Sequence, residues 1–125
     1  MKNKELADKI KATIRKYPRA FDMRDYFTTT VTSEDALRLL RLDPGCGLQA
    51  CIAGWACVLS DVNDFQNFPP GLAAQRLLGL DSKELFYVGY WPDVLWSEYR
   101  MALRSDDYNE MVEAACKAID HFMES

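Results

Sequence analysis

The chain has 125 residues, of which 49% are hydrophobic and 27% are charged. This size and composition are typical of one globular domain with its own core, and they argue against a chain that is disordered throughout. The net charge of −4 at pH 7 supplies no overall positive field for a phosphate backbone or an anionic lipid surface. We therefore expect a single domain over residues 1–125, and the charge disfavours nucleic acid and membranes as partners.

The chain contains no run of the roughly 18–20 apolar residues that a membrane-spanning helix needs. Residues 1–11 are rich in charge and lack the apolar stretch of a signal peptide. The expected location is the cytoplasm, where cysteines are kept reduced. We therefore expect no disulfide among the four cysteines, Cys46, Cys51, Cys57 and Cys116.

The N-terminal part predicts two helices with an extended segment between them. Asn3 can cap a first helix, which Pro18 ends. The apolar residues of this helix follow at spacings of four, four and three: Leu6, Ile10, Ile14 and Tyr17. Residues 26–31 are rich in β-branched and aromatic side chains and predict an extended segment. Ser33 can cap a short second helix, whose apolar residues occupy positions 36–42.

Residues 48–59, LQACIAGWACVL, form the most apolar stretch and carry no charge. This pattern is typical of a helix that is buried on every side, so we expect it at the centre of the fold. Gly54 lowers the helix propensity of this stretch by about 1 kcal/mol relative to Ala. Its presence predicts that another helix crosses closely at this point.

The stretch that follows predicts one helix and a shorter one after it. Pro70 suits the first turn of a helix, and Gly79 suits the position just after its end. Asp81 and Glu84 have the spacing of a capping box, which predicts a short helix that continues to Tyr87.

Two longer helices are predicted at the C-terminal end. Pro92 suits the start of the first, and Asp106 or Asp107 can cap the second. The apolar stripe of the last helix consists of Tyr108, Met111, Val112, Ala115, Ile119 and Phe122. The predicted fold is all-α, a compact single-domain bundle of five or six short helices around the central apolar helix at about 48–59.

Several short motifs occur in a fixed order along residues 21–122. They are Phe21-Asp22-Met23, Cys46-Gly47, the CIAGWA block from Cys51, Leu77-Leu78-Gly79-Leu80, Leu85-Phe86-Tyr87, Trp91-Pro92 and Ile119-Asp120-His121-Phe122. This order resembles a family of small hypothetical proteins of bacteria and their phages, to which no function is assigned. Leu48 departs from the family pattern, which often has Thr there. The resemblance implies one compact helical domain and no particular activity.

The cysteines do not have the spacing of a zinc site. Four residues separate Cys46 from Cys51 and five separate Cys51 from Cys57, whereas closely spaced zinc ligands usually lie two to four residues apart. On one helix, Cys51 and Cys57 would also point about 240° apart. We therefore predict small buried hydrophobic side chains, with no metal and no cofactor. A metal site, or a reactive thiolate near a helix N-terminus, stays open as an alternative.

His121 is the only histidine. Together with Cys51 and either Asp120 or Asp93 it could form a Cys–His–Asp arrangement, although the sequence does not bring these groups together. A lone histidine near a C-terminus is more often a group at a helix end or on the surface. We expect no catalytic residues and a protein that is not an enzyme.

Residues 73–87 have the outline of a helix-turn-helix DNA reader, because two predicted helices flank a turn at Gly79. A recognition helix must offer polar and basic side chains to base edges. The second predicted helix offers Lys83 as its one cation, followed by an apolar run at 85–88. We therefore favour plain helix packing, with a DNA-binding regulator as the alternative.

Five large aromatic residues crowd residues 87–99: Tyr87, Tyr90, Trp91, Trp96 and Tyr99. Such side chains serve both small cores and the centres of interfaces. The segment that contains Trp91 and Pro92 joins two helices, so its backbone should run over the surface. We therefore expect Tyr90 and Trp91 to form an exposed pair that binds a partner together with Asp93, and Trp96 to belong to the core.

The function that we expect is a non-catalytic protein-binding domain. Its partner would be another protein or a second copy of the chain, and a phage accessory protein that acts on a host component would fit the size, the acidity and the resemblance. Acidic residues near the predicted site, Asp93 and Glu98, would favour a basic partner surface. A small metal- or thiol-dependent factor is a further alternative.

Overall fold

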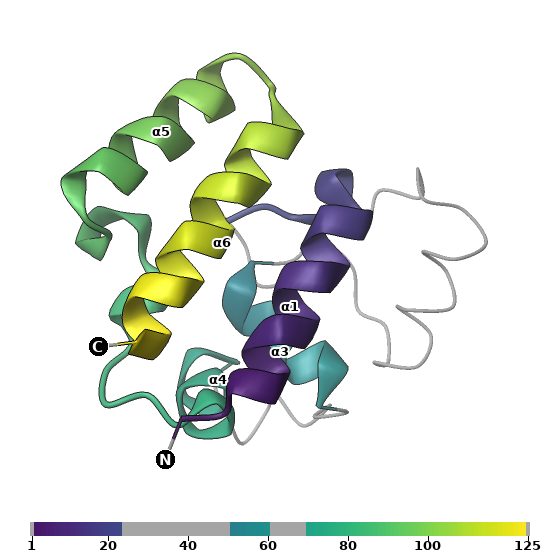
Figure 1. Ribbon diagram of the computed structural model, residues 1–125, viewed down its shortest axis with the longest axis vertical. Coiled ribbons are helices and arrows are strands. Elements are labelled where there is room, and N and C mark those ends of the chain that lie inside the picture. Colours follow the sequence, from purple (N-terminus) through teal and green to yellow (C-terminus); the bar gives the residue numbers. More distant parts are fainter. Residues whose placement is uncertain (1, 24–50, 61–69, 125) are drawn as a thin grey trace.

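The computed structural model describes residues 2–23, 51–60 and 70–124 of the chain. These residues form a compact helical structure, which confirms the predicted all-α class. The α-helices are α1 (Lys4–Lys16), α3 (Ile52–Leu59), α4 (Pro70–Leu78), α5 (Asp93–Arg104) and α6 (Tyr108–Glu124), and the 3₁₀-helices are η1 (Pro18–Ala20), η2 (Glu84–Phe86) and η3 (Val88–Tyr90) (Figure 1). The predicted segments at 26–31 and 36–42, and Cys46, lie outside the described residues.

Helix α1 begins at the predicted cap, Asn3. The side-chain oxygen of Asn3 accepts a hydrogen bond of 3.1 Å from the backbone N–H of Leu6. The side-chain amide of Asn3 donates to the carbonyl of Leu77 at 3.2 Å, and its backbone N–H donates to the carbonyl of Leu78 at 2.9 Å. One residue thus satisfies terminal backbone groups of two helices, at the start of α1 and the end of α4. The buried residues of α1 are Leu6, Ala7, Ile10 and Ile14.

Helix α3 lies in the interior and packs against α1 and α4. Residues 51–58 are all buried, which confirms the predicted buried helix. The predicted start at residue 48 is wrong, because Cys51 has an extended backbone with φ −80° and ψ −178° and is the N-cap. Its sulfur accepts a hydrogen bond of 3.5 Å from the N–H of Gly54. Trp55 fixes α3 to η1 by donating its indole N–H to the carbonyl of Ala20 at 3.0 Å.

Helix α4 ends at Leu78, and Gly79 occupies the next position, as predicted, with a left-handed φ of 72°. The N–H of Leu80 donates to the carbonyl of Gln75 at 3.0 Å, and that of Gly79 donates to the carbonyl of Arg76 at 3.2 Å. These two bonds satisfy the last carbonyls of the helix in the Schellman pattern, which needs a residue that tolerates positive φ.

The predicted capping box after α4 is wrong. The Ser82 hydroxyl oxygen, and not the Asp81 carboxylate, accepts a hydrogen bond of 3.4 Å from the N–H of Glu84. Only three residues then form the 3₁₀-helix η2, so no helix continues to Tyr87. Leu85 and Phe86 of η2 are buried and fix this short element to the core.

Helices α5 and α6 form an antiparallel pair, in which α6 lies between α5 and α1 (Figure 1). The side chain of Asp107 caps α6 by accepting a hydrogen bond of 3.2 Å from the N–H of Glu110. Asp107 is one of the two residues that the sequence predicts as the cap of this helix. None of the helices in the described residues is long and apolar enough to cross a membrane.

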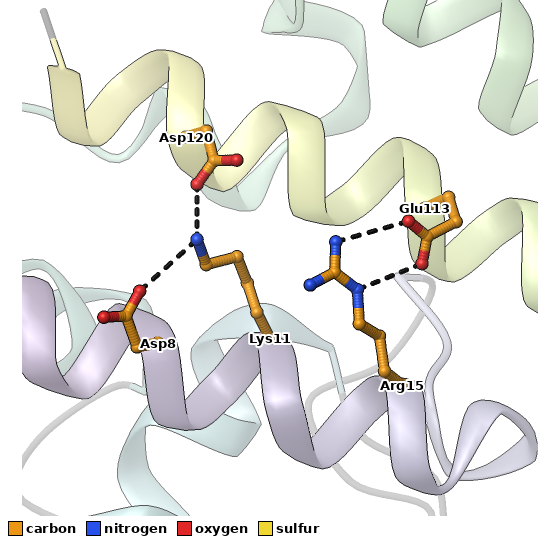
Figure 2. A network of polar contacts seen from close by, with 5 residues as sticks. All are labelled: Asp8, Lys11, Arg15, Glu113 and Asp120. Atoms are coloured by element: carbon orange, nitrogen blue, oxygen red, sulfur yellow. Dashed lines mark hydrogen bonds and ion pairs between the residues drawn. The ribbon is translucent and has the colours of Figure 1, made fainter.

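Two ion pairs join α1 to α6 along the edge of their contact (Figure 2). The Lys11 ammonium lies 2.6 Å from the carboxylate of Asp120. The Arg15 guanidinium donates two hydrogen bonds to Glu113, of 3.1 and 3.2 Å. Because two parallel bonds fix the direction of both side chains, this pair is geometrically more specific than a single contact.

Candidate functional site

Helix α5 lies at the outside of the molecule and presents one face to solvent. It packs against α6 and η3, and lies on the side of α6 away from α1 (Figure 1). The stripe that faces inward consists of Leu95, Tyr99 and Ala102, at spacings of four and three. Val94 and Met101, seven residues apart, share another face of the helix. They are 68% and 69% exposed, so this face has no covering element in the described structure.

Two tyrosines that precede α5 in the chain are also exposed. Tyr87 is 47% and Tyr90 66% exposed, and their rings meet edge to face with centroids 6.2 Å apart. All exposed large hydrophobic side chains of the described residues therefore fall between positions 87 and 101. We call this set the α5 surface; its members are Tyr87, Tyr90, Val94, Trp96 and Met101, of which Trp96 lies on the other side of the buried stripe from Val94 and Met101.

The charged groups on α5 differ from the expected acidic neighbourhood. Glu98 is not available as a free acidic group, because it accepts a hydrogen bond of 3.3 Å from Lys117 of α6. The guanidinium carbon of Arg100 lies 4.9 Å from the ring centroid of Trp96, close enough for cation–π attraction. Asp93 at the start of α5 and Arg104 at its end are both exposed. The surface therefore carries both signs of charge and does not select a basic partner.

Trp91 is not on this surface, so the predicted exposed pair of Tyr90 and Trp91 is wrong. Trp91 is only 3% exposed. Its indole N–H donates a hydrogen bond of 2.8 Å to the carbonyl of Leu85, and its ring meets Tyr99 edge to face at 5.5 Å. The backbone before Pro92 runs over the surface, but the side chain turns inward, where a large ring is stabilised once its N–H has a partner.

The prediction that Trp96 belongs to the core is also wrong, because its side chain is 38% exposed. The inward stripe of α5 is marked by Leu95 and Tyr99, and each residue along a helix turns by about 100°. Trp96 follows Leu95 directly and therefore points to the side of the stripe. The spacing of Leu95, Tyr99 and Ala102 was the signal that could have assigned the core side of α5 correctly.

The described cysteines behave as buried apolar groups. Cys51, Cys57 and Cys116 are all buried. Burial raises the pKa of Cys57 to about 12 and that of Cys116 to about 11. Both thiols are therefore protonated near neutral pH, and a protonated thiol is a poor nucleophile and metal ligand. Among the residues described, no group of three or more His, Cys, Asp or Glu side chains is placed to hold a metal ion.

His121 does not take part in a Cys–His–Asp arrangement in the described part of the chain. It is exposed on α6, and its ring packs edge to face against Phe122 at 5.0 Å. Asp120 is held by Lys11 of α1, and Cys51 is buried at the start of α3. A triad needs a carboxylate that orients the imidazole and an imidazole beside the nucleophile.

Residues 73–87 do not form a helix-turn-helix. Helix α4 is followed by the three-residue 3₁₀-helix η2, whereas a recognition helix must be long enough to lie in the major groove. Leu85 and Phe86 are buried in the core, so they are not available to contact base edges. The alternative of a helix-turn-helix DNA reader therefore finds no recognition helix in this segment.

A surface pocket of about 570 Å³ lies between the end of α1 and the turn that joins α5 to α6. Its charged lining contains two basic and two acidic residues: Lys16, Arg19, Asp106 and Asp107. Lys16 lies 5.5 Å from the ring centroid of Tyr17, and the guanidinium carbon of Arg19 lies 5.8 Å from that of Tyr108. The cations are thus already placed over rings of the same pocket, and the lining favours neither an anion nor a cation.

Comparison of the chain with protein-family models, with curated proteins and with solved structures gives no match. The resemblance to small bacterial and phage proteins therefore stays a prediction. The roles of Tyr90 and Asp93 in binding a partner also stay predictions, and the α5 surface is the candidate site that the geometry supports best.

Proposed function

We propose that this protein is a non-catalytic domain that acts by binding another protein chain through the α5 surface. The observation that carries the proposal is the gathering of exposed large hydrophobic side chains at residues 87–101 of the described structure. Single exposed apolar residues are ordinary on soluble proteins, whereas a group of them in one region is typical of an interaction site.

The side chains of the α5 surface are also suited to binding in their type and rigidity. Tyr, Trp and Arg dominate the residues that contribute most to protein interfaces. The edge-to-face contact of Tyr87 with Tyr90, and the stacking of Arg100 on Trp96, restrict these side chains before a partner arrives. Restricted side chains lose less conformational entropy on association, which favours affinity.

Site-specific photo-crosslinking tests the proposal. The photoreactive residue p-benzoylphenylalanine replaces Tyr90, whose ring it resembles, in cells that produce the protein. A matched control carries the same residue in place of Lys9, which is exposed on α1. Illumination should give a discrete adduct from position 90 and none from position 9.

A second substitution decides whether the adduct depends on the α5 surface. Met101→Asp places a charge on the exposed apolar face of α5 without touching the core, so the melting temperature should stay unchanged. The adduct from position 90 should then be lost. Equal adducts from positions 90 and 9, or an adduct that survives Met101→Asp, would contradict the proposal.

A further inference from the structure

The outer face of α5 is self-complementary. Asp93 begins the helix and Arg104 ends it, and both are exposed. Val94 and Met101 lie further in and carry the largest exposed fractions of this helix's hydrophobic side chains. Ser97, a small exposed residue, lies between them. The order along the helix is therefore acidic, apolar, small, apolar and basic.

We propose that the occupant of the α5 surface is a second copy of this chain, whose α5 packs antiparallel across a two-fold axis. This inference rests on the proposed function, since it names the partner of the same surface. A two-fold contact pairs residue i with residue j and residue j with residue i. Each pair of residues therefore occurs twice in the contact, once on either side of the axis. A single antiparallel register must then be favourable for all pairs of the face.

The positions along α5 fit one such register. The midpoint between Asp93 and Arg104 falls between residues 98 and 99, and the midpoint between Val94 and Met101 falls between residues 97 and 98. An axis level with Glu98, between these two midpoints, brings Asp93 within one residue of Arg104 of the partner subunit and Val94 within one residue of Met101 of the partner subunit.

The groups near the axis allow the two helices to approach. Ser97 adds little bulk at the crossing, and the separation of packed helices depends on the side chains at their contact. Arg100 is drawn sideways over the ring of Trp96, which reduces repulsion between the two copies of this cation near the axis. The resulting contact has opposite charges at both ends and apolar side chains between them.

Charge reversal tests the register, with sedimentation equilibrium from micromolar to millimolar concentration as the measurement. The unaltered chain should show a monomer–dimer equilibrium. Asp93→Arg and Arg104→Asp each place like charges opposite one another, at both ends of the contact, and each should raise the dimer dissociation constant by about tenfold or more. An equimolar mixture of the two variants should dimerise like the unaltered chain, because every Arg then faces an Asp.

The mixture separates self-association from any general effect of the substitutions on α5. The mixture contains the same two variants that are measured alone. A loss of folding or helix content in either variant would therefore persist in the mixture, whereas a loss caused by like charges would not. The inference is overturned if the unaltered chain stays monomeric over the whole range. It is also overturned if neither variant is weakened, or if the mixture is as weak as the variants.

Failure of the dimer and failure of the proposed function give different results. A monomeric protein whose position 90 still cross-links to a different chain, in a manner lost in Met101→Asp, overturns the dimer alone. A protein that gives no such adduct contradicts the binding function as a whole. A cross-linked product with twice the mass of the chain, lost in Met101→Asp, supports both.

Discussion

The indole N–H of Trp91 donates a hydrogen bond of 2.8 Å to the carbonyl of Leu85, across the short 3₁₀-helices that precede α5. The same ring packs against Tyr99, whose ring in turn meets Phe21 edge to face at 6.4 Å. The Tyr99 hydroxyl accepts a hydrogen bond of 3.2 Å from the N–H of Met23. Three distant parts of the chain are thus joined through one row of aromatic side chains.

Trp91→Ala should lower the free energy of unfolding by about 3–5 kcal/mol, because a large buried side chain is removed and a cavity remains. Urea denaturation followed by circular dichroism measures this loss. Tyr90→Ala is the matched control, since its side chain is 66% exposed and its removal should change stability by no more than about 0.5 kcal/mol. Similar losses in both variants would mean that Trp91 is not a core residue.

Gly54→Leu should destabilise the protein by about 1–3 kcal/mol or more, because Gly54 is buried in α3 and the added side chain would overpack the contacts with neighbouring helices. The measurement is the shift of the thermal unfolding midpoint. Gly89→Ala is the control, since a Cβ at Gly89 would meet no atom within 4 Å. An unchanged midpoint in Gly54→Leu would show that no helix crosses α3 closely there.

The ion pair between α1 and α6 predicts a pH-dependent contribution to stability. The hydrogen bond that the Lys11 ammonium donates to the Asp120 carboxylate raises the pKa of Lys11 above its usual 10.5. The folded state therefore holds this proton more tightly, so the stabilisation is complete below about pH 10.5 and is lost as the pH rises through the folded-state pKa.

Lys11→Met measures this contribution. At neutral pH the variant should lose up to about 1 kcal/mol relative to the unaltered chain, as for other partly exposed pairs. The difference between the two proteins should shrink above pH 10.5 in urea denaturation curves. Lys9→Met removes a more exposed pair with Glu5 within α1, at 3.6 Å, and should cost less. A Lys11→Met difference that grows with pH would contradict the assignment.

The buried thiols should resist alkylation while the protein is folded. With pKa values of about 12 for Cys57 and about 11 for Cys116, the thiolate fraction at pH 8 should be about 1000-fold and 100-fold below that of an ordinary cysteine. Mass spectrometry after iodoacetamide treatment should find both unlabelled in the folded protein and labelled in urea. Because these pKa values are raised, ionisation above pH 9 favours the unfolded chain. Rapid labelling of folded Cys57 would contradict its burial.

The helix ends that depend on local hydrogen bonds could be predicted from the sequence. Asn3 caps α1, Gly79 follows the end of α4, and Asp107, one of two predicted candidates, caps α6, because each interaction needs only partners a few residues away. The apolar stripe of α1 and the continuous apolar run of α3 likewise predict burial, since their periodicity is a property of the segment alone.

Which aromatic residues lie inside depends on contacts between segments that are distant in the chain. Trp91 is buried because Leu85 and Tyr99 supply a hydrogen-bond acceptor and a ring, and Tyr99 is itself held by residues 21 and 23. Trp96 is exposed because it lies beside the stripe of α5 that those contacts bury. The segment that precedes α5 has no helical periodicity to show which way its side chains point. The residues of the α5 surface could therefore not be predicted from the sequence. The residues of the α5 surface are exposed because distant segments of the chain pack against the neighbouring aromatic residues and not against them.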